Sequence, residues 1–178
     1  YGSLVMCPLN GPPVDLCDVA AFAYLEPITD KELFLLTAQI PFPLSGTERL
    51  RLEDHPCHLY RLSLDTRKLK QVSETPLVWF TLSPDRTHFL AVRAGLEAAD
   101  YWKSTCVSLH DVSGRELKRV KAFREKESRL VAMPFWTGND SFILPWCQEG
   151  AETKVRVERY NLKGEVSDDL SKAYTELK

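Results

Sequence analysis

A repeated strand–turn–strand pattern constrains the fold of this chain more than any other feature of its sequence. Each copy has alternating apolar residues, then a tight polar turn, then the start of a second strand-like run. The three copies are residues 59–69, 107–117 and 157–166. With Leu64, Val112 and Leu162 aligned as equivalent positions, successive copies lie 48 and 50 residues apart. A nearly constant period of this size indicates one structural unit repeated along the chain.

A second hairpin-like pattern precedes each copy of the first. Its copies are residues 21–36, 78–92 and 131–144. Two hairpins per unit make four strands per unit, and four strands in a period of about 50 residues are typical of a β-propeller blade. We therefore predict an all-β chain with about three four-stranded antiparallel blades. Because propellers typically close with about four to eight blades, this would be an incomplete or fragmentary β-propeller.

Particular residues in these hairpins resemble known propeller families. Residues 82–92, Leu-Ser-Pro-Asp followed by Phe-Leu-Ala-Val, resemble the SPDG…LAF hairpin of TolB-like and WD40-like propellers. Residues 107–114 resemble the WD40 strand V-x-L-W-D-x-x-x-G, with His110 in the usual tryptophan position. Residues 59–66 are closer to the TolB-like pattern L-Y-x-x-D-x-x-T-G, with Arg67 where glycine is usual.

This resemblance covers about residues 19–166 and implies an architecture rather than an activity. The chain lacks the regular Gly-His and Trp-Asp pairs of WD40 proteins, so it resembles a diverged propeller more than a true WD40 array. The predicted organisation is one domain, with an N-terminal loop, three repeats and a C-terminal tail. The corresponding boundaries are 1–18, 19–76, 77–128, 129–166 and 167–178.

Composition and charge argue against several classes of partner. Apolar residues make up 44% of the chain and the net charge is −2, so a core can form but no field of one sign attracts nucleic acid. No apolar run approaches the roughly 20 residues that span a bilayer. The five cysteines are sparse, although Cys7 and Cys17 could bridge the N-terminal loop in an oxidising compartment. The sequence identifies no compartment.

Candidate metal and catalytic groups are few. Residues 54–58, Asp-His-Pro-Cys-His, include four competent ligands, but no second cluster completes a site, so we predict neither a metal nor a cofactor. The sequence has no Gly-x-Ser-x-Gly elbow, no phosphate-binding glycine loop and no distinguishable carboxylate pair. His110 is expected to replace a structural tryptophan rather than to act as a base. An enzyme is therefore the less favoured class.

The long connections between the second and third strands of the first two units suggest a binding face. Loops carry function more often than the strands that support them, and these two connections span about residues 41–57 and 94–105. The candidate binding residues are Arg49, Arg51, Asp54, His55, His58, Tyr101 and Trp102. The leading hypothesis is a non-catalytic binding or scaffold module for a protein or peptide, within a larger chain or a homo-oligomer. The alternatives are a hydrolase or lyase with its site on the same face, and a structural oligomerisation domain.

Alternation along the strands also predicts the core. We expect five aliphatic residues to be buried, namely Leu64, Leu90, Val112, Ile143 and Leu162. We expect five aromatic residues to pack between blades, namely Trp79, Phe80, Phe135, Trp136 and Trp146. The charge-rich run 115–127 is expected to form an outer strand with one solvated face, since its glutamates dilute any nucleic-acid patch.

Overall fold

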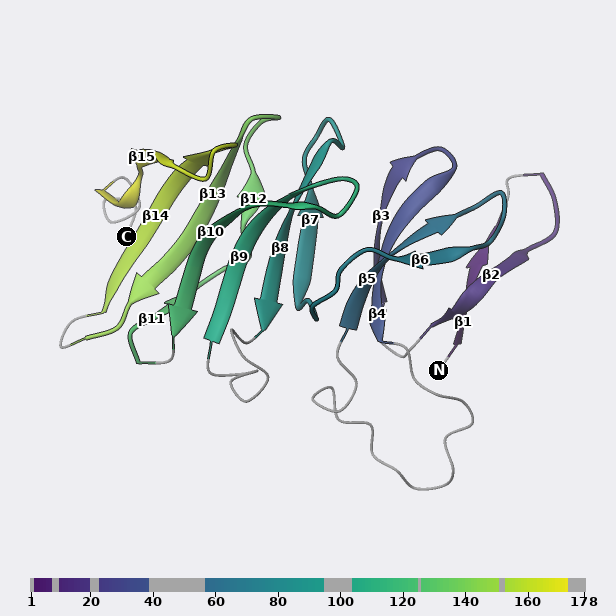
Figure 1. The fold of residues 1–178 in the computed structure, drawn as a ribbon, viewed down its shortest axis with the longest axis horizontal. Helices are drawn as coiled ribbons and strands as arrows, with labels where there is room; N and C mark the ends of the chain where they lie inside the picture. Colours follow the sequence, from purple (N-terminus) through teal and green to yellow (C-terminus); the bar gives the residue numbers. More distant parts are fainter. Residues whose placement is uncertain are drawn as a thin grey trace, which may run out of the picture. The chain divides into compact units, whose positions relative to one another are not determined.

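The computed structural model describes residues 2–7, 10–19, 23–38, 57–94, 104–124, 126–150 and 153–172. These residues form fifteen strands in four antiparallel sheets (Figure 1). The predicted all-β class with four-stranded antiparallel sheets is confirmed. The chain divides into two compact units, Tyr1–Leu77 and Val78–Lys178, where the sequence predicts a single domain. No helix among the described residues has the length and hydropathy needed to span a membrane.

The first unit begins with a hairpin rather than the predicted N-terminal loop. Strands β1 (Gly2–Met6) and β2 (Val14–Val19) pair antiparallel, with Leu4 opposite Cys17. Leu16 is buried, which gives the hairpin an apolar anchor. The proline-rich residues between the strands suggested a loop, but they only connect two short paired runs.

A four-stranded sheet completes the first unit. Its strands are β3 (Ala23–Thr29), β4 (Glu32–Ala38), β5 (Cys57–Ser63) and β6 (Leu69–Gln71), in the order β3-β4-β5-β6. The two central strands carry most of the buried side chains: Phe34, Leu35, Leu36, Leu59 and Leu62 are all 0% exposed. Successive buried residues on β4 show that both faces of this strand are covered.

The second unit contains two sheets. The first has the order β10-β9-β8-β7, from β7 (Trp79–Leu82), β8 (His88–Ala94), β9 (Ser104–Asp111) and β10 (Glu116–Arg124). The second is built from β11 (Ser128–Leu130), β12 (Phe135–Trp136), β13 (Ser141–Gln148), β14 (Lys154–Asn161) and β15 (Val166–Asp169). Both β11 and β12 pair with β13, so they are two pieces of one interrupted strand. The repeat boundaries proposed from the sequence stay a prediction.

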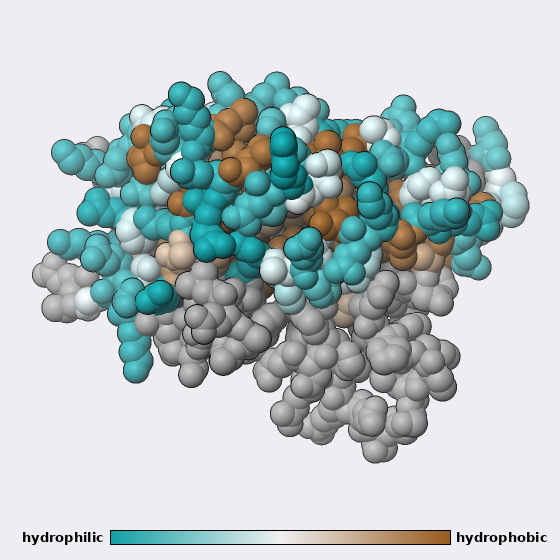
Figure 2. Space-filling model, in the orientation of Figure 1, coloured by the Kyte–Doolittle hydropathy of each residue, from teal (hydrophilic) through white to brown (hydrophobic). Residues whose placement is uncertain are grey.

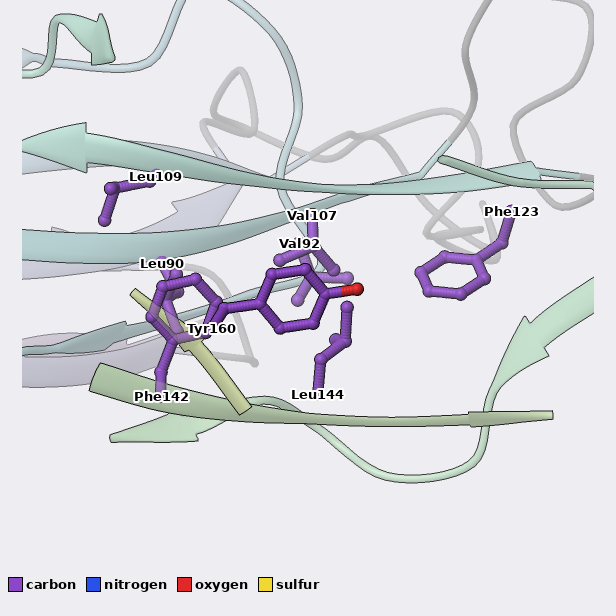
Figure 3. Packing of buried hydrophobic residues seen from close by; sticks show 8 residues of the cluster. All are labelled: Leu90, Val92, Val107, Leu109, Phe123, Phe142, Leu144 and Tyr160. Atoms are coloured by element: carbon purple, nitrogen blue, oxygen red, sulfur yellow. The ribbon is translucent and has the colours of Figure 1, made fainter. Parts of the chain in front are cut away.

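One hydrophobic core joins the two sheets of the second unit. Figure 3 shows its side chains converging in the space between the strands. The β7–β10 sheet contributes Leu90, Val92, Val107, Leu109 and Phe123, and the β11–β15 sheet contributes Phe142, Leu144 and Tyr160. The rings of Phe142 and Tyr160 stack with centroids 5.6 Å apart, and Trp136 meets Phe142 edge-on at 5.4 Å. Burial on this scale is the main stabilising contribution to such a pair of sheets.

The turn after the third strand has similar hydrogen bonds in all three of these larger sheets. Its first residue is Ser63, Asp111 or Asn161, and the side-chain oxygen accepts a hydrogen bond from a backbone N–H of the turn, at 3.3, 3.0 and 2.9 Å respectively. The backbone N–H of the same residue bonds to a carbonyl across the turn, at 3.1, 3.1 and 3.0 Å. Short polar side chains favour such turns because they satisfy local backbone donors. The turns that begin at Asp111 and Asn161 share one design, and the turn that begins at Ser63 is one residue longer.

Each of these turns contains, near its end, a residue in the left-handed backbone conformation. Gly114 and Gly164 have φ values of 101° and 70°, where a side chain is disfavoured. In the first copy the position belongs to Arg67, with φ of 55°. Arg67, which replaces the glycine of the TolB-like pattern, thus adopts the same left-handed backbone conformation as the glycines of the other two copies.

Burial follows the predicted alternation except near strand ends. Leu90 and Ile143 are buried, at 0% and 8% exposure. Leu64, Val112 and Leu162 are only half-buried, which corrects the prediction for all three. Each stands one residue beyond the end of its strand, where the turn begins, and Leu162 packs against the edge of the core from there.

The predicted aromatic core is also partly wrong. Phe80 is fully buried, and Trp79, Trp136 and Trp146 are half-buried. Phe135 is 48% exposed, because it lies on β12 opposite Ile143, on the face of the sheet away from Phe142. Sequence alternation alone could not distinguish the two faces of this short strand.

Candidate functional site

Of the predicted binding residues, the structure describes only His58. The other six, which lie outside the described residues, are Arg49, Arg51, Asp54, His55, Tyr101 and Trp102. His58 is half-buried on β5, and its Nδ1 lies 3.2 Å from both the Ser73 carbonyl oxygen and Gln71 Nε2. These contacts connect the imidazole to the end of β6 and to the residues that follow it. The binding face proposed from the sequence therefore stays a prediction.

The predicted metal-ligand cluster is likewise described only at Cys57 and His58. Burial raises the pKa of the Cys57 thiol, which opposes formation of the thiolate that a metal requires. Within the described ranges, no group of three or more His, Cys, Asp or Glu side chains could hold a metal ion. Cys7 is an exposed free thiol, so a bridge to Cys17 is absent from this structure.

Ser108 and His110 have the spacing of a nucleophile and its base. The Ser108 hydroxyl oxygen lies 2.8 Å from His110 Nε2, while His110 Nδ1 lies 3.2 Å from the Gly114 carbonyl oxygen. A carbonyl only accepts, so Nδ1 donates to it and Nε2 accepts the proton of the Ser108 hydroxyl. Ser108 is 0% exposed, and the imidazole stacks on Phe89 with centroids 4.8 Å apart. A buried serine cannot reach a substrate, so this pair supports a structural role for His110.

The buried imidazole predicts a pH dependence of stability. Desolvation lowers the pKa of His110 below its usual 6.5, although Gly114 and Glu116 oppose the shift. As the pH falls, the imidazole becomes protonated in the unfolded chain before it does in the folded protein. The stabilisation from the neutral imidazole is therefore fully present above about pH 6.5 and is lost as the pH falls below that value. We expect the free energy of unfolding to decrease below this pH, and to decrease less in His110→Phe, which keeps the stacking. Urea denaturation between about pH 5 and pH 8 measures this. An equal decrease in the variant would contradict it.

The second unit also contains a polar cluster, which we call the Glu158 cluster: the half-buried Lys121, Trp146 and Glu158, and the buried Tyr160. Glu158 Oε2 accepts hydrogen bonds from Trp146 Nε1 at 2.8 Å and from the Tyr160 hydroxyl at 2.7 Å. The Lys121 ammonium lies 3.6 Å from the same oxygen and 3.5 Å from the centroid of the Trp146 ring. Lys121 comes from β10, whereas the other three come from β13 and β14. The cluster therefore links the two sheets beside their shared core.

The electrostatics of the Glu158 cluster indicate a structural link between the two sheets rather than a reactive centre. Desolvation lowers the pKa of Lys121, but the Glu158 carboxylate opposes that shift by stabilising the ammonium. Burial raises the pKa of Tyr160 well above its usual 10, and its bond to Glu158 adds to this. The donors of the cluster all converge on one carboxylate oxygen. No sequence motif indicated this arrangement, because its members lie on three separate strands.

Exposed apolar residues gather where the first strand of the β11–β15 sheet is interrupted. Val131, Met133 and Phe135 are 43%, 44% and 48% exposed, and we call residues 131–135 the apolar segment. Pro134, which is buried, lies within it, and Val131 N–H donates to the Pro145 carbonyl at 3.2 Å. On the face shown in Figure 2, hydrophobic residues of the described chain lie in patches separated by hydrophilic side chains. Sequence reasoning assigned Phe135 to the core and missed this segment.

Comparison with known proteins finds similarity at the level of structure. No protein-family model matches the sequence, and no curated protein matches it. The chain is similar to the β-propeller domain of the Trilobed protease from Pyrococcus furiosus, with a TM-score of 0.52 and 15% sequence identity. The match covers 85% of this chain and 44% of that one. A structure of TolB from Acinetobacter baumannii matches at 11% identity with a TM-score of 0.33, covering 92% of this chain and 47% of that one.

These similarities concern the fold. The described sheets are those of a partial β-propeller with diverged repeats, as the sequence predicts. The chain spans less than half the length of the propeller structures that it matches. At 15% identity, neither an activity nor a ligand transfers from the archaeal protein to this chain.

Proposed function

We propose that this chain is a non-catalytic propeller-type module that binds a protein or peptide, with the apolar segment as a primary contact. The observation that carries this proposal is the exposure of three large apolar side chains at alternate positions: Val131, Met133 and Phe135. Apolar surface that a fold leaves in water at one place is typical of interaction sites. Methionine and phenylalanine also adapt well to an apolar partner surface.

The chemistry of the remaining described groups supports binding over catalysis. Ser108 is fully buried beside His110. The Lys121 ammonium is paired with Glu158 and lies over a tryptophan ring. These potentially reactive groups are thus engaged with other parts of the fold, whereas the side chains of Val131, Met133 and Phe135 are exposed. The partner we propose is an extended peptide or loop with hydrophobic side chains.

The residues predicted from the sequence remain part of this proposal. We propose further contacts in the connections between second and third strands, at Arg49, Arg51, Asp54, His55, Tyr101 and Trp102, and at His58 near the start of β5. Tyr101 and Trp102 belong to the connection between β8 and β9, in the same unit as the apolar segment. Aromatic residues of this kind commonly anchor protein contacts.

Selection from a random peptide display library tests the proposal, with the purified chain as bait. Peptides that survive selection are synthesised, and their affinities are measured by isothermal titration calorimetry. We expect hydrophobic peptides that bind at least roughly tenfold more weakly to a Val131→Ser, Met133→Ser, Phe135→Ser variant. Leu25→Ser is the control, because Leu25 is 42% exposed on β3, which belongs to the other compact unit.

Three outcomes would count against the proposal. One is a selection that enriches no peptide. The second is a set of peptides whose affinity is unchanged by the triple substitution. The third is a triple variant that loses self-association, measured by light scattering, while peptide binding is kept. That third result would favour the structural oligomerisation hypothesis.

A further inference from the structure

Strand β10 is the longest open sheet edge among the described strands. It has nine residues, and the order β10-β9-β8-β7 leaves one of its sides without a neighbouring strand. An unpaired edge presents backbone N–H and C=O groups that can pair with an added strand. The open edge of β10 therefore offers a strand-sized binding site.

The other edges of the four-stranded sheets are shorter or blocked. Strand β3 contains Pro27 and a register shift beside it, and β6 has three residues. Strand β7 has four residues, and the Thr81 carbonyl accepts a hydrogen bond from Trp136 Nε1 at 3.1 Å. Prolines, irregularities and side-chain caps are common ways to prevent edge pairing. Strand β10 has two register shifts of its own, but it is the longest of these edges and contains no proline, which makes it the favoured edge for strand addition.

The regular part of β10 lies toward its C-terminal end. Register shifts occur before Lys118 and before Lys121, but the pairing with β9 is uninterrupted from Lys121 to Arg124. No proline occurs in the strand. An added strand could therefore follow the backbone over this stretch.

The charge of β10 selects among possible strands. The strand carries Lys118, Arg119, Lys121 and Arg124, against one acidic residue, Glu116. The Glu116 carboxylate forms ion pairs with the guanidinium of Arg93 at 3.2 Å and with that of Arg119 at 3.9 Å. The Lys121 ammonium pairs with Glu158. Lys118 and Arg124 are exposed on opposite faces of the sheet, because Lys118 lies opposite Leu109 and Arg124 lies opposite Ser104. The Lys118 side chain also lies against Gly164. Neither cation forms an ion pair with any residue that the structure describes. The edge thus has an excess of uncompensated positive charge.

We propose that β10 receives an acidic, extended segment of a partner protein as an additional strand of the β7–β10 sheet. Backbone hydrogen bonds to the edge supply affinity, and Lys118 and Arg124 supply the preference for Glu and Asp side chains. The same cations repel a second copy of β10, because like charges would then lie side by side. A basic edge therefore excludes self-pairing while it remains open to an acidic strand.

This inference concerns a different surface from the apolar segment, so either proposal can fail while the other holds. The probe is a short peptide of Glu and Val with both ends blocked, in which Glu occupies odd and even positions so that carboxylates lie on both faces of the added strand. Its binding is measured by isothermal titration calorimetry at low ionic strength, where charge attraction is least screened. Three comparison probes are the same peptide with Lys for Glu, the Glu peptide with alternate backbone nitrogens methylated, and a single-stranded oligonucleotide of equal charge.

We expect the Glu peptide to bind and the Lys peptide and the methylated peptide not to bind. The Lys118→Glu, Arg124→Glu double variant should bind the Glu peptide roughly tenfold more weakly, or worse. The matched control is Lys68→Glu, Lys70→Glu, which makes the same charge change at two exposed residues on and beside β6. Circular dichroism verifies that both double variants keep the β-sheet spectrum.

Each remaining outcome would overturn the inference. No binding of the Glu peptide would show that the edge does not accept a strand. Equal binding of the methylated peptide would show charge attraction without strand addition. Stronger binding of the oligonucleotide would identify a nucleic-acid surface instead. An equal loss of affinity in the control variant would show that the net charge of the protein, rather than the cations of β10, determines peptide binding.

Discussion

Replacing Leu90 with alanine should lower the free energy of unfolding by about 2–5 kcal/mol, the usual range for truncating a buried leucine. Leu90 is 0% exposed and lies in the core between the β7–β10 and β11–β15 sheets. The truncation removes apolar contacts on both sides of that core and leaves a cavity that the surrounding strands cannot fill. Urea denaturation followed by circular dichroism gives the free energy directly.

Leu117→Ala is the matched control for this substitution. It makes the same chemical change on β10, at a residue that is 40% exposed. We expect a loss within about 0.5 kcal/mol, the usual size for surface substitutions. Equal losses for the two variants would mean that Leu90 does not occupy the core described here.

Glu158→Ala should be nearly as damaging, with a loss of about 2–4 kcal/mol in the free energy of unfolding. The alanine variant leaves the Trp146 indole N–H and the Tyr160 hydroxyl without their acceptor. It also removes the carboxylate that faces the Lys121 ammonium, whose side chain is 25% exposed. Hydrogen-bond donors without an acceptor and a charge without a counter-ion lower the stability of the fold where water is largely excluded.

Two variants separate the contributions within the Glu158 cluster. Glu158→Gln keeps an oxygen acceptor but removes the charge, so we expect a smaller loss of about 1–2 kcal/mol. Glu149→Ala removes an ion pair with Arg129 that is shorter, at 2.9 Å, but far more exposed. That exposed pair should contribute less than about 1 kcal/mol. If Glu149→Ala proved as destabilising as Glu158→Ala, burial would not explain the contribution of the Glu158 cluster to the free energy of unfolding.

The repeat architecture could be predicted because its signals are local. Ser83-Pro84-Asp85 forms a turn in which Ser83 Oγ donates to the Asp85 carboxylate at 2.6 Å, and the apolar run after it forms β8. Asp111 and Asn161 cap equivalent turns with their own side chains. Such turn chemistry depends on a few neighbouring residues, so a single sequence contains it.

The β1–β2 hairpin and the apolar segment could not be predicted in the same way. Strands β1 and β2 are short, and the prolines between them are equally compatible with a loop. The exposure of Phe135 depends on which face of β12 meets the core, and that depends on its pairing with β13. A break within one strand, between β11 and β12, leaves the alternation ambiguous.

The Glu158 cluster could not be predicted because it is a product of packing. Lys121 lies in a charge-rich run that predicts a solvated strand, and Glu158 alternates with apolar residues on β14 as a surface residue would. Only the packing of β10 against β13 and β14 brings the ammonium, the indole and the carboxylate together. Long-range juxtaposition of this kind leaves no local pattern in a single sequence.

Nuclear Overhauser effects between side chains of the second unit test most directly whether the chain is built from stacked, propeller-type sheets. The structure predicts contacts from Leu90 and Val92 on β8 to Phe142 and Leu144 on β13, across the core in Figure 3. Contacts within each sheet, such as Phe142 to Tyr160, serve as the internal control. Observation of both sets is the predicted result. Strong contacts within each sheet, with none between β8 and β13, would contradict the stacked arrangement on which the account rests.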